Sequence, residues 1–142
     1  MIAQQLTVSI PNQPGQLSKV SELLGDTGIN VKAVTAHIMG EGAEIHMVVD
    51  DFAKAQEVLK AHQYETRGRP VIAVEAPDHP GGLNAILRPL RDAGINVEYL
   101  YPAIGKLGDK AIIIVGADPI EDAVKALGRH YINVLDQELF RL

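Results

Sequence analysis

A repeat limits what this chain can fold into, because residues 8–36 and 74–102 carry the same pattern 66 positions apart. Composition alone would supply about two identities over such a span. The identical pairs are Val8/Val74, Pro11/Pro77, Pro14/Pro80, Gly15/Gly81, Leu17/Leu83, Leu24/Leu90, Asp26/Asp92, Gly28/Gly94, Ile29/Ile95, Asn30/Asn96 and Val31/Val97. Both the turn residues and the apolar spacing recur, which indicates two copies of one small fold.

Each copy opens with a strand that leads into a helix. Apolar residues alternate with polar ones over 5–10, which predicts a strand with Leu6, Val8 and Ile10 on its buried face. Pro11 and the Pro-Gly pair end this strand, and leucine and valine then recur at helical spacing. A glycine at the end of each helix, Gly28 or Gly94, fits a left-handed position before the next strand.

The second half of each copy reads as a hairpin, a helix and a final strand. Glycine-bearing turns separate β-rich apolar runs near residues 40 and 108. Helix starts are expected at Asp50-Asp51 and at Asp118-Pro119, with Asp118 as N-cap and Pro119 at the first helical position. Final strands are expected within 64–69 and 133–142. The order per copy is β-α-β-β-α-β.

These elements predict an α+β protein with two ferredoxin-like βαββαβ units in tandem, 1–69 and 70–142. Each antiparallel sheet would carry its helices on one face, with the other face polar or paired. Only "RGRP" separates the last strand of the first copy from the first strand of the second. We therefore expect no flexible linker and rigid docking of the two units.

Composition narrows the class of protein. With 46% hydrophobic and 22% charged residues, the 142-residue chain resembles a soluble globular protein. No apolar stretch approaches the roughly 20 residues of a membrane span, and the start lacks a signal-peptide pattern. Cysteine is absent and the net charge is −5, which argues against thiol chemistry and against nucleic acid as a partner. We expect a cytoplasmic protein without a membrane or nucleic-acid partner.

The repeated turn resembles a known family. "N-x-P-G-x-L" at 12–17, an amphipathic helix and "D-x-G-I-N-V" at 26–31, repeated with small changes at 78–83 and 92–97, resemble the ACT domain family. The resemblance covers essentially the whole chain and implies a tandem ACT protein. ACT domains are regulatory modules that bind amino acids or similar small effectors at interfaces between two domains. The resemblance thus implies allosteric sensing without catalysis or a cofactor.

The turn chemistry suggests where an effector would bind. A Pro-Gly turn exposes the first N–H groups of the helix, where the helix dipole adds partial positive charge, so the α-carboxylate of an amino acid is a suitable guest. Gly15 or Gly81 would let the carboxylate approach the backbone, and Val at either position is expected to abolish binding while leaving the fold intact. Nearby side chains would hold the ammonium group: Asn12 and Gln13 in the first copy, Asp78 and His79 in the second.

Similarity to serine-regulated ACT domains implies effector contacts from Asn12 and Asn30. In the second copy Asn96 matches, but Asp78 replaces the first asparagine, so the two sites would differ in charge. The full set of candidate ligand-binding residues is Asn12, Gln13, Pro14, Gly15, Gln16, Leu17, Asn30, Val31, Asp78, His79, Pro80, Gly81, Gly82, Leu83, Asn96 and Val97.

Other features have simpler explanations. Pro-Gly is common turn punctuation, and Asn30 and Asn96 can satisfy the local backbone. Tyr99 and Tyr101 share a strand face, where packing is favoured over contact with a ligand. His37 and His46 could meet across a hairpin, but the chain has no metal-binding motif and no catalytic constellation. Eight charged helix residues are expected to be solvated: Lys19, Glu22, Lys54, Glu57, Lys60, Arg88, Arg91 and Lys125.

Three functional classes remain. The leading hypothesis is an amino-acid sensor that acts on a partner enzyme or on its own oligomeric state, most simply a homodimer. The second is a non-catalytic subunit that docks on a biosynthetic enzyme. The third is an unrelated split β-α-β protein, such as a nucleic-acid-binding module or a small hydrolase. The few aromatic residues and the negative charge place RNA binding last.

Overall fold

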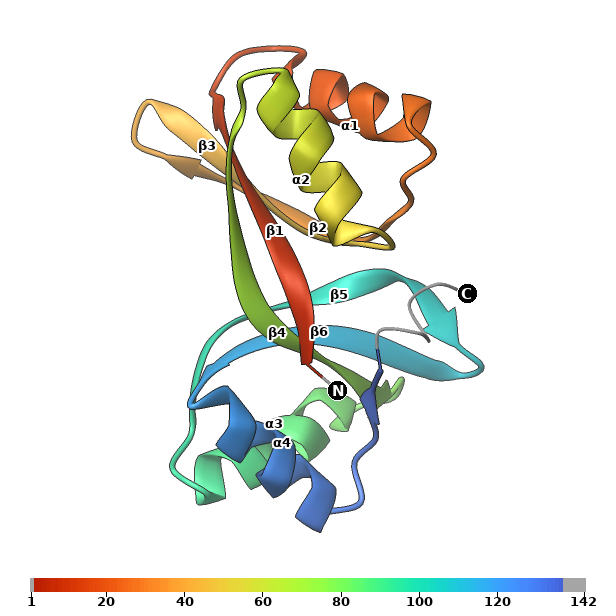
Figure 1. The fold of residues 1–142 in the computed structure, drawn as a ribbon. Helices are drawn as coiled ribbons and strands as arrows, with labels where there is room; N and C mark the ends of the chain where they lie inside the picture. Colours follow the sequence, from red (N-terminus) through yellow and green to blue (C-terminus); the bar gives the residue numbers. More distant parts are fainter. Residues whose placement is uncertain (1, 137–142) are drawn as a thin grey trace. The chain divides into compact units, whose positions relative to one another are not determined.

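The computed structural model describes residues 2–136 and divides into two compact units (Figure 1). The first unit is Gln4–Arg69. The second is the chain from Pro70 onward together with the start of the first strand, Ile2 and Ala3. Within the described residues there are four helices, two in each unit, and the strands pair antiparallel in every registered pair.

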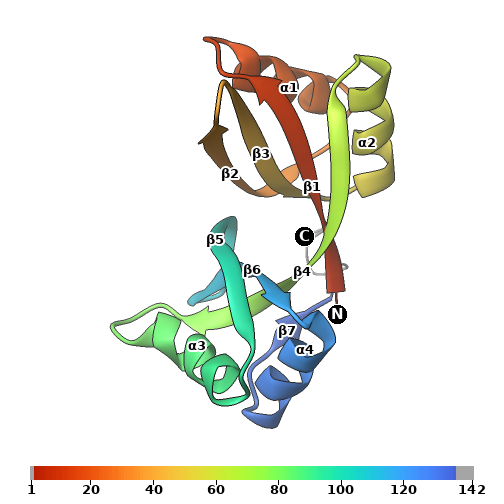
Figure 2. The same ribbon diagram turned by 90° about the vertical axis from the view of Figure 1, so that its left-hand side faces the viewer.

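The first unit has the order β-α-β-β-α-β. Its elements are β1 (Ile2–Pro11), α1 (Gln16–Asp26), β2 (Val31–Met39), β3 (Gly42–Val49), α2 (Phe52–Ala61) and the beginning of β4 (Glu65–Pro77). Strand β3 lies between β1 and β2, and β1 also pairs with β4. Figure 2 shows α1 and α2 on the same side of these strands. The β2–β3 hairpin turns at Gly40, as predicted.

The second unit repeats this order. Its elements are the end of β4, α3 (Gly82–Asp92), β5 (Asn96–Leu107), β6 (Lys110–Asp118), α4 (Ile120–Arg129) and β7 (Val134–Leu135). Strand β6 lies between β5 and β4, and β7 pairs with β4 at Ala73 and Val74. The predicted final strand over 133–142 is present at Val134–Leu135, and residues beyond 136 lie outside the described part.

Strand β4 joins the units without a break. The sequence predicts two strands separated by "RGRP", but the structure has one strand of 13 residues from Glu65 to Pro77. Its first part belongs to the first unit and the rest to the second. An extended backbone accommodates Pro70 because proline fixes φ near the extended region. The last strand of one copy is therefore continuous with the first strand of the next.

Each unit has its own apolar core. In the first, Leu6 and Val8 of β1 pack with Val20 and Leu24 of α1 and with Leu59 of α2. The second core contains the corresponding residues Ile72, Val74, Ile86, Leu90 and Leu127. The alternating pattern that predicted the inner face of β1 is confirmed, since Leu6 and Val8 have no exposed surface.

The opposite face of β1 carries a cluster of polar side chains. From the sequence, this face of the sheet was expected to be polar or paired. Gln5 is fully buried, and its Nε2 lies 3.3 Å from Thr7 Oγ1 and 2.9 Å from His46 Nδ1. Glu44 links the cluster to the surface through contacts with His46 and Arg67. Burial lowers the pKa of His46, an effect that Glu44 partly opposes. Hydrogen bonding offsets the cost of placing these polar groups inside.

Of four helix-end residues with a role predicted from the sequence, three have that role in the structure. Asp51 caps α2, because its carboxylate accepts a hydrogen bond from Lys54 N–H at 3.1 Å. Gly28 and Gly94 adopt the expected left-handed conformation, with φ of 76° and 72°. Asp118 is not an N-cap, because it is the last residue of β6 and Pro119 occupies the cap position. No side chain in the described part of the chain caps α4. Strand pairing of Asp118 with Asn96 keeps Asp118 in the sheet.

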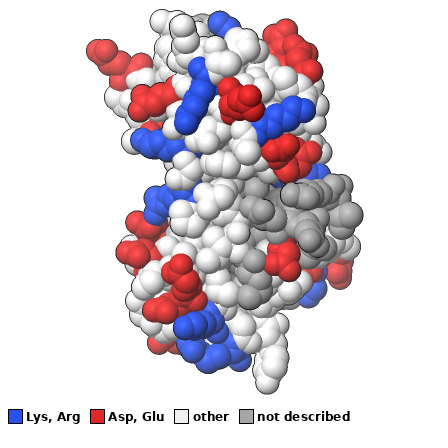
Figure 3. All heavy atoms as spheres, viewed as in Figure 1, with Lys and Arg blue, Asp and Glu red and all other residues white. Residues whose placement is uncertain are grey.

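The surface carries charges of both signs. The eight charged helix residues expected to be solvated are all exposed. On the face shown in Figure 3, acidic and basic side chains are interspersed. Each helix of residues 2–136 is too short or too polar to span a bilayer.

Candidate functional site

The first strand-to-helix turn presents unbonded amides at the start of α1. Gly15 occupies the cap position in a left-handed conformation, φ 85° and ψ −7°, and no side chain of the described residues caps the helix. Gln16 N–H reaches Gln13 O at 3.4 Å, but among residues 2–136 the N–H groups of Leu17 and Ser18 have no acceptor. These two amides, with the helix dipole behind them, form a weak positive site.

The second turn has the same backbone conformation and different surroundings. Gly81 has φ 84° and ψ −5°, and the N–H groups of Leu83 and Asn84 lack acceptors within the described chain. Gly82 N–H donates to His79 O at 2.9 Å. A Cβ on Gly82 would lie 1.8 Å from Pro77 O, so the first residue of α3 packs directly on the preceding strand. The first copy has Gln16 at this position.

A pocket of about 200 Å³ lies beside the first turn. Three predicted site residues, Asn12, Gln13 and Leu17, line it. The other lining residues, which the sequence did not assign to the ligand site, come from the ends of β1, β2 and β3: Ile10, Pro11, Ala36, His37, Ile38 and Ala43. Strand register brings them together, since Ala43 of β3 lies opposite both Ile10 and Ile38. An apolar wall thus faces the polar turn.

The acidic residue of the second turn already has a partner. Lys106 of β5 contacts the Asp78 carboxylate, and this hydrogen bond and charge lower the pKa of Asp78. His79 Nδ1 lies 2.9 Å from Pro80 O. By contrast, the side chains of Asn12 and Gln13 have no hydrogen-bond partner within residues 2–136. The first turn is therefore free to bind a ligand, whereas Asp78 would have to leave Lys106.

Asn30 and Asn96 lie at the far ends of the helices from the turns. An 11-residue helix is about 16 Å long, so α1 separates Asn30 from Asn12 within the first unit. Asn30 N–H donates to Asp50 Oδ1 at 3.0 Å, and Asp50 N–H donates to Asn30 O at 3.1 Å. Both asparagines are exposed, while Val31 and Val97 pack against the two cores. One unit alone does not bring the two predicted asparagines together.

The two glycines of the Pro-Gly turns have a conformational role. At φ near 85° a Cβ would be strained, although it would meet no atom within 4 Å at Gly15 or Gly81. Valine at either position would therefore strain the turn, contrary to the expectation that the fold would stay intact. Substitution of these glycines does not separate binding from folding.

The histidine and tyrosine pairs have structural settings. The rings of His37 and His46 lie 5.4 Å apart, and no group of three metal-binding side chains occurs among the described residues. The rings of Tyr99 and Tyr101 stack with centroids 6.4 Å apart. Tyr101 is 4% exposed, and burial raises its pKa well above the ordinary value. Packing explains both tyrosines.

Comparison with known proteins assigns the chain to a family of paired domains. The family model described as "ACT domain pair" matches residues 1–141. No protein of curated function matches the sequence.

Solved structures of other proteins resemble the fold. Protein BT0572 from Bacteroides thetaiotaomicron has a TM-score of 0.92 and 24% identity, with 100% of this chain and 98% of that chain covered. The regulatory subunits of aspartate kinase from Thermus thermophilus and Thermus flavus have TM-scores of 0.64 and 0.57, each with 22% identity and 92% coverage of both chains. At these identities the likeness concerns the fold.

Proposed function

Because the chain belongs to the ACT domain pair family, we propose that it is a non-catalytic sensor that binds a small amino acid at an interface between ACT domains. Occupancy would regulate a partner enzyme or the oligomeric state of the chain in the cytoplasm. The proposal takes 1–69 and 70–142 as two ferredoxin-like domains. One observation carries it: the pocket of about 200 Å³ adjoins the uncapped start of α1.

The polar end of this pocket suits a zwitterion. The unbonded N–H groups of Leu17 and Ser18 are donors for an α-carboxylate, as helix N-termini commonly are for anions. The amide oxygens of Asn12 and Gln13 are acceptors for the ammonium group. Because these side chains have no partner among the described residues, a ligand would replace water rather than break a protein contact.

The apolar end of the pocket limits the effector's side chain. Ile10, Leu17 and Ile38 line it, and its volume lies below the roughly 300–1,000 Å³ of sites for drug-sized ligands. A small amino acid is therefore favoured over an aromatic one. The second turn, with Asp78 held by Lys106, would bind such a ligand more weakly.

The position of Asn30 supports binding between domains. Since α1 separates Asn12 from Asn30, one effector could contact a turn and a helix-end asparagine only if two domains supplied them. A second copy of the chain, giving a homodimer, would provide such a domain. Asn30 and Asn96 are both exposed and available for this contact.

The test is calorimetry with a panel of amino acids on the full chain and two variants. Asn12→Leu should weaken binding at least about tenfold, because a hydrogen bond to a charged group contributes roughly 1.5–3 kcal/mol. Gln56→Leu, an amide lost from α2 outside the pocket, should leave amino-acid affinity unchanged. Equal loss in both variants, or no heat with any amino acid, would refute the sensor.

A second candidate is a subunit that docks on a biosynthetic enzyme, with effector binding optional. The end of the β2–β3 hairpin favours it, because Ile38 is 71% and Met39 57% exposed. Exposed apolar side chains that adjoin one another are typical of interaction surfaces. Under this hypothesis, calorimetry detects no binding of any amino acid. A biosynthetic enzyme co-purifies with the chain but not with the double variant Ile38→Asp, Met39→Asp.

A further inference from the structure

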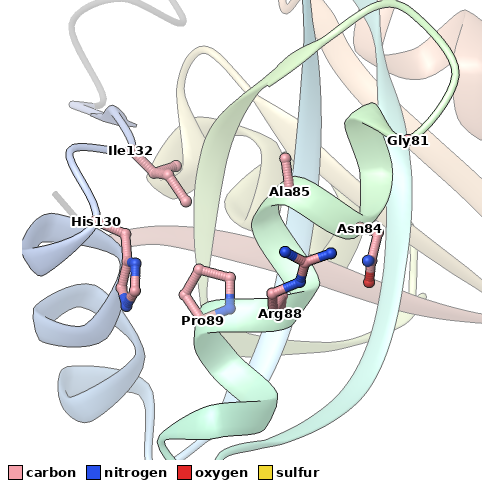
Figure 4. A pocket seen from close by; sticks show the side chains of 7 residues that line it. All are labelled: Gly81, Asn84, Ala85, Arg88, Pro89, His130 and Ile132. Atoms are coloured by element: carbon pink, nitrogen blue, oxygen red, sulfur yellow. The ribbon is translucent and has the colours of Figure 1, made fainter.

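The second unit contains a larger pocket, of about 440 Å³, on the helical side of the fold (Figure 4). Asn84, Arg88 and His130 are its polar residues, and Ala85, Pro89 and Ile132 form its apolar wall. Figure 4 shows His130 at the end of α4, with Pro89 between Arg88 and His130 in this view. The labelled residues on α3 are Asn84, Ala85, Arg88 and Pro89, and Gly81 lies just before the helix. The volume falls within the roughly 300–1,000 Å³ typical of small-molecule sites.

The charge of this pocket is not balanced. No Asp or Glu of residues 2–136 lines it, although the chain as a whole has a net charge of −5. Arg88 forms no salt bridge and His130 no side-chain hydrogen bond with any residue of the described chain. The neighbouring arginine of the same helix, Arg91, is paired with Asp92 at 3.0 Å. A guanidinium left without a carboxylate partner is a ready bidentate donor to an anion.

The corresponding surface of the first unit shows the contrast. Ile132 N–H donates to Leu127 O as Tyr64 N–H does to Leu59 O, so Ile132 and Tyr64 are equivalent. By the same correspondence His62 matches His130, and the 66-residue repeat matches Glu22 with Arg88. The first unit thus has an acidic residue where the second has Arg88, and a larger Tyr64 that packs on the core. At this place the two copies therefore differ in the sign of the charge and in the size of the side chain.

We propose that this pocket binds a small organic anion, a carboxylate or phosphate attached to an apolar body. The Arg88 guanidinium and the His130 ring contact the anionic group, the Asn84 amide donates a further hydrogen bond, and the apolar body covers Pro89 and Ile132. The site is distinct from the pocket at Asn12 and does not depend on the sensor function proposed above. It gives the second unit a ligand of its own.

Binding is tested by NMR on the full chain with four probes: phenyl phosphate, benzoate, inorganic phosphate and benzyl alcohol. Phenyl phosphate or benzoate should shift the amide signals of Asn84, Ala85 and Ile132 in a saturable manner. Inorganic phosphate should bind more weakly because it lacks the apolar body, and benzyl alcohol because it lacks the charge. The tighter of the two aromatic anions identifies the preferred anionic group.

Charge variants of one helix provide the matched control. Arg88→Glu, which introduces the first unit's residue type, should weaken the aromatic anions at least about tenfold. Arg91→Glu changes the net charge equally but lies outside the pocket, so it should leave affinity within about twofold. Ile132→Tyr, again copying the first unit, should block the apolar wall. Arg88 and Arg91 are exposed, so both charge variants should keep the melting temperature of the parent.

Three results would overturn the proposal. The first is the absence of saturable shifts at Asn84, Ala85 and Ile132 with either aromatic anion. The second is an equal loss of affinity in Arg88→Glu and Arg91→Glu, which would indicate general charge attraction. The third is binding of benzyl alcohol as tight as that of benzoate. Asn84→Leu should weaken the anions while Asn12→Leu does not, so failure here is distinguishable from failure of the amino-acid sensor.

Discussion

The two strand-to-helix turns share a backbone and differ in almost everything around it. Gly15 and Gly81 have φ of 85° and 84°, and within residues 2–136 no side chain caps the helix that follows either of them. In the first turn Asn12 and Gln13 line a pocket and have no partner among the described residues. In the second, Asp78 contacts Lys106 and Gly82 packs on Pro77. A duplicated turn can thus keep its geometry while the side chains before the helix are free in one copy and engaged in the other.

One pair of facing residues in each hairpin shows that the packing also differs while the backbone arrangement is the same. Ala33 lies opposite Val48 in the first unit, and Tyr99 lies opposite Gly116 in the second. A Cβ on Gly116 would lie 2.2 Å from the Tyr99 ring. The small residue is therefore on β2 in one unit and on β6 in the other. The larger side chain of the facing pair thus lies on β3 in the first unit and on β5 in the second, while the strands pair in the same way.

The largest effect is expected at the close contact of the second turn. Gly82→Ala would place a methyl group 1.8 Å from Pro77 O, which is backbone and cannot rotate away. Overpacking of this kind costs about 3 kcal/mol in the free energy of unfolding. Gln16→Ala, the same position of the first turn, should cost less than about 0.5 kcal/mol. Urea denaturation of both variants measures the difference, and equal stability of the two would contradict this account of the second turn.

A smaller effect is expected from the exchanged pair. Gly116→Val should destabilise the chain by about 2 kcal/mol, because the valine and the Tyr99 ring compete for one volume. Adding Tyr99→Ala recreates the pair of the first unit and should recover most of that loss. A double-mutant cycle measured by chemical denaturation gives the coupling. Additive losses would mean that the two residues do not share space.

The smallest effect concerns pH. Lys106 lowers the folded-state pKa of Asp78, so the contact stabilises the fold above the unfolded-state pKa and is lost as pH falls through the folded value. In Lys106→Met, the pKa of Asp78 should rise toward its ordinary value in an NMR titration. The carboxylate in an Asn12→Asp variant, which has no such lysine, should titrate at higher pH than Asp78. Identical titration of Asp78 with and without Lys106 would contradict the contact.

Much of the fold could be predicted because its signals are local. Alternation in β1, the helical spacing around Leu24 and the left-handed glycines Gly28 and Gly94 all depend on neighbours in the sequence. Asp118 was predicted to cap a helix because Asp-Pro has that local preference, but pairing with Asn96 keeps it in a strand. The sequence did not predict the continuity of β4, because Gly68 and Pro70 are typical of a break between two strands.

The candidate site was predictable in part. The turn motif identified Asn12, Gln13 and Leu17, which line the pocket. It did not identify His37, Ile38 or Ala43, because their proximity depends on the register of three strands. The sequence predicted that these residues lie in strands. It did not predict that they align with the end of β1. The Lys106 contact with Asp78 was likewise hidden, because it joins residues 28 positions apart.

By itself the sequence determined that this chain is a duplication, that each copy is a split β-α-β unit and that a left-handed glycine follows the first helix of each. These properties follow from backbone conformation, which neighbouring residues govern. Only the tertiary structure decided which copies of the repeated residues are free and which are engaged. Pockets and charge pairs depend on side chains brought together across strands and helices, and two turns with the same backbone conformation have different neighbours there.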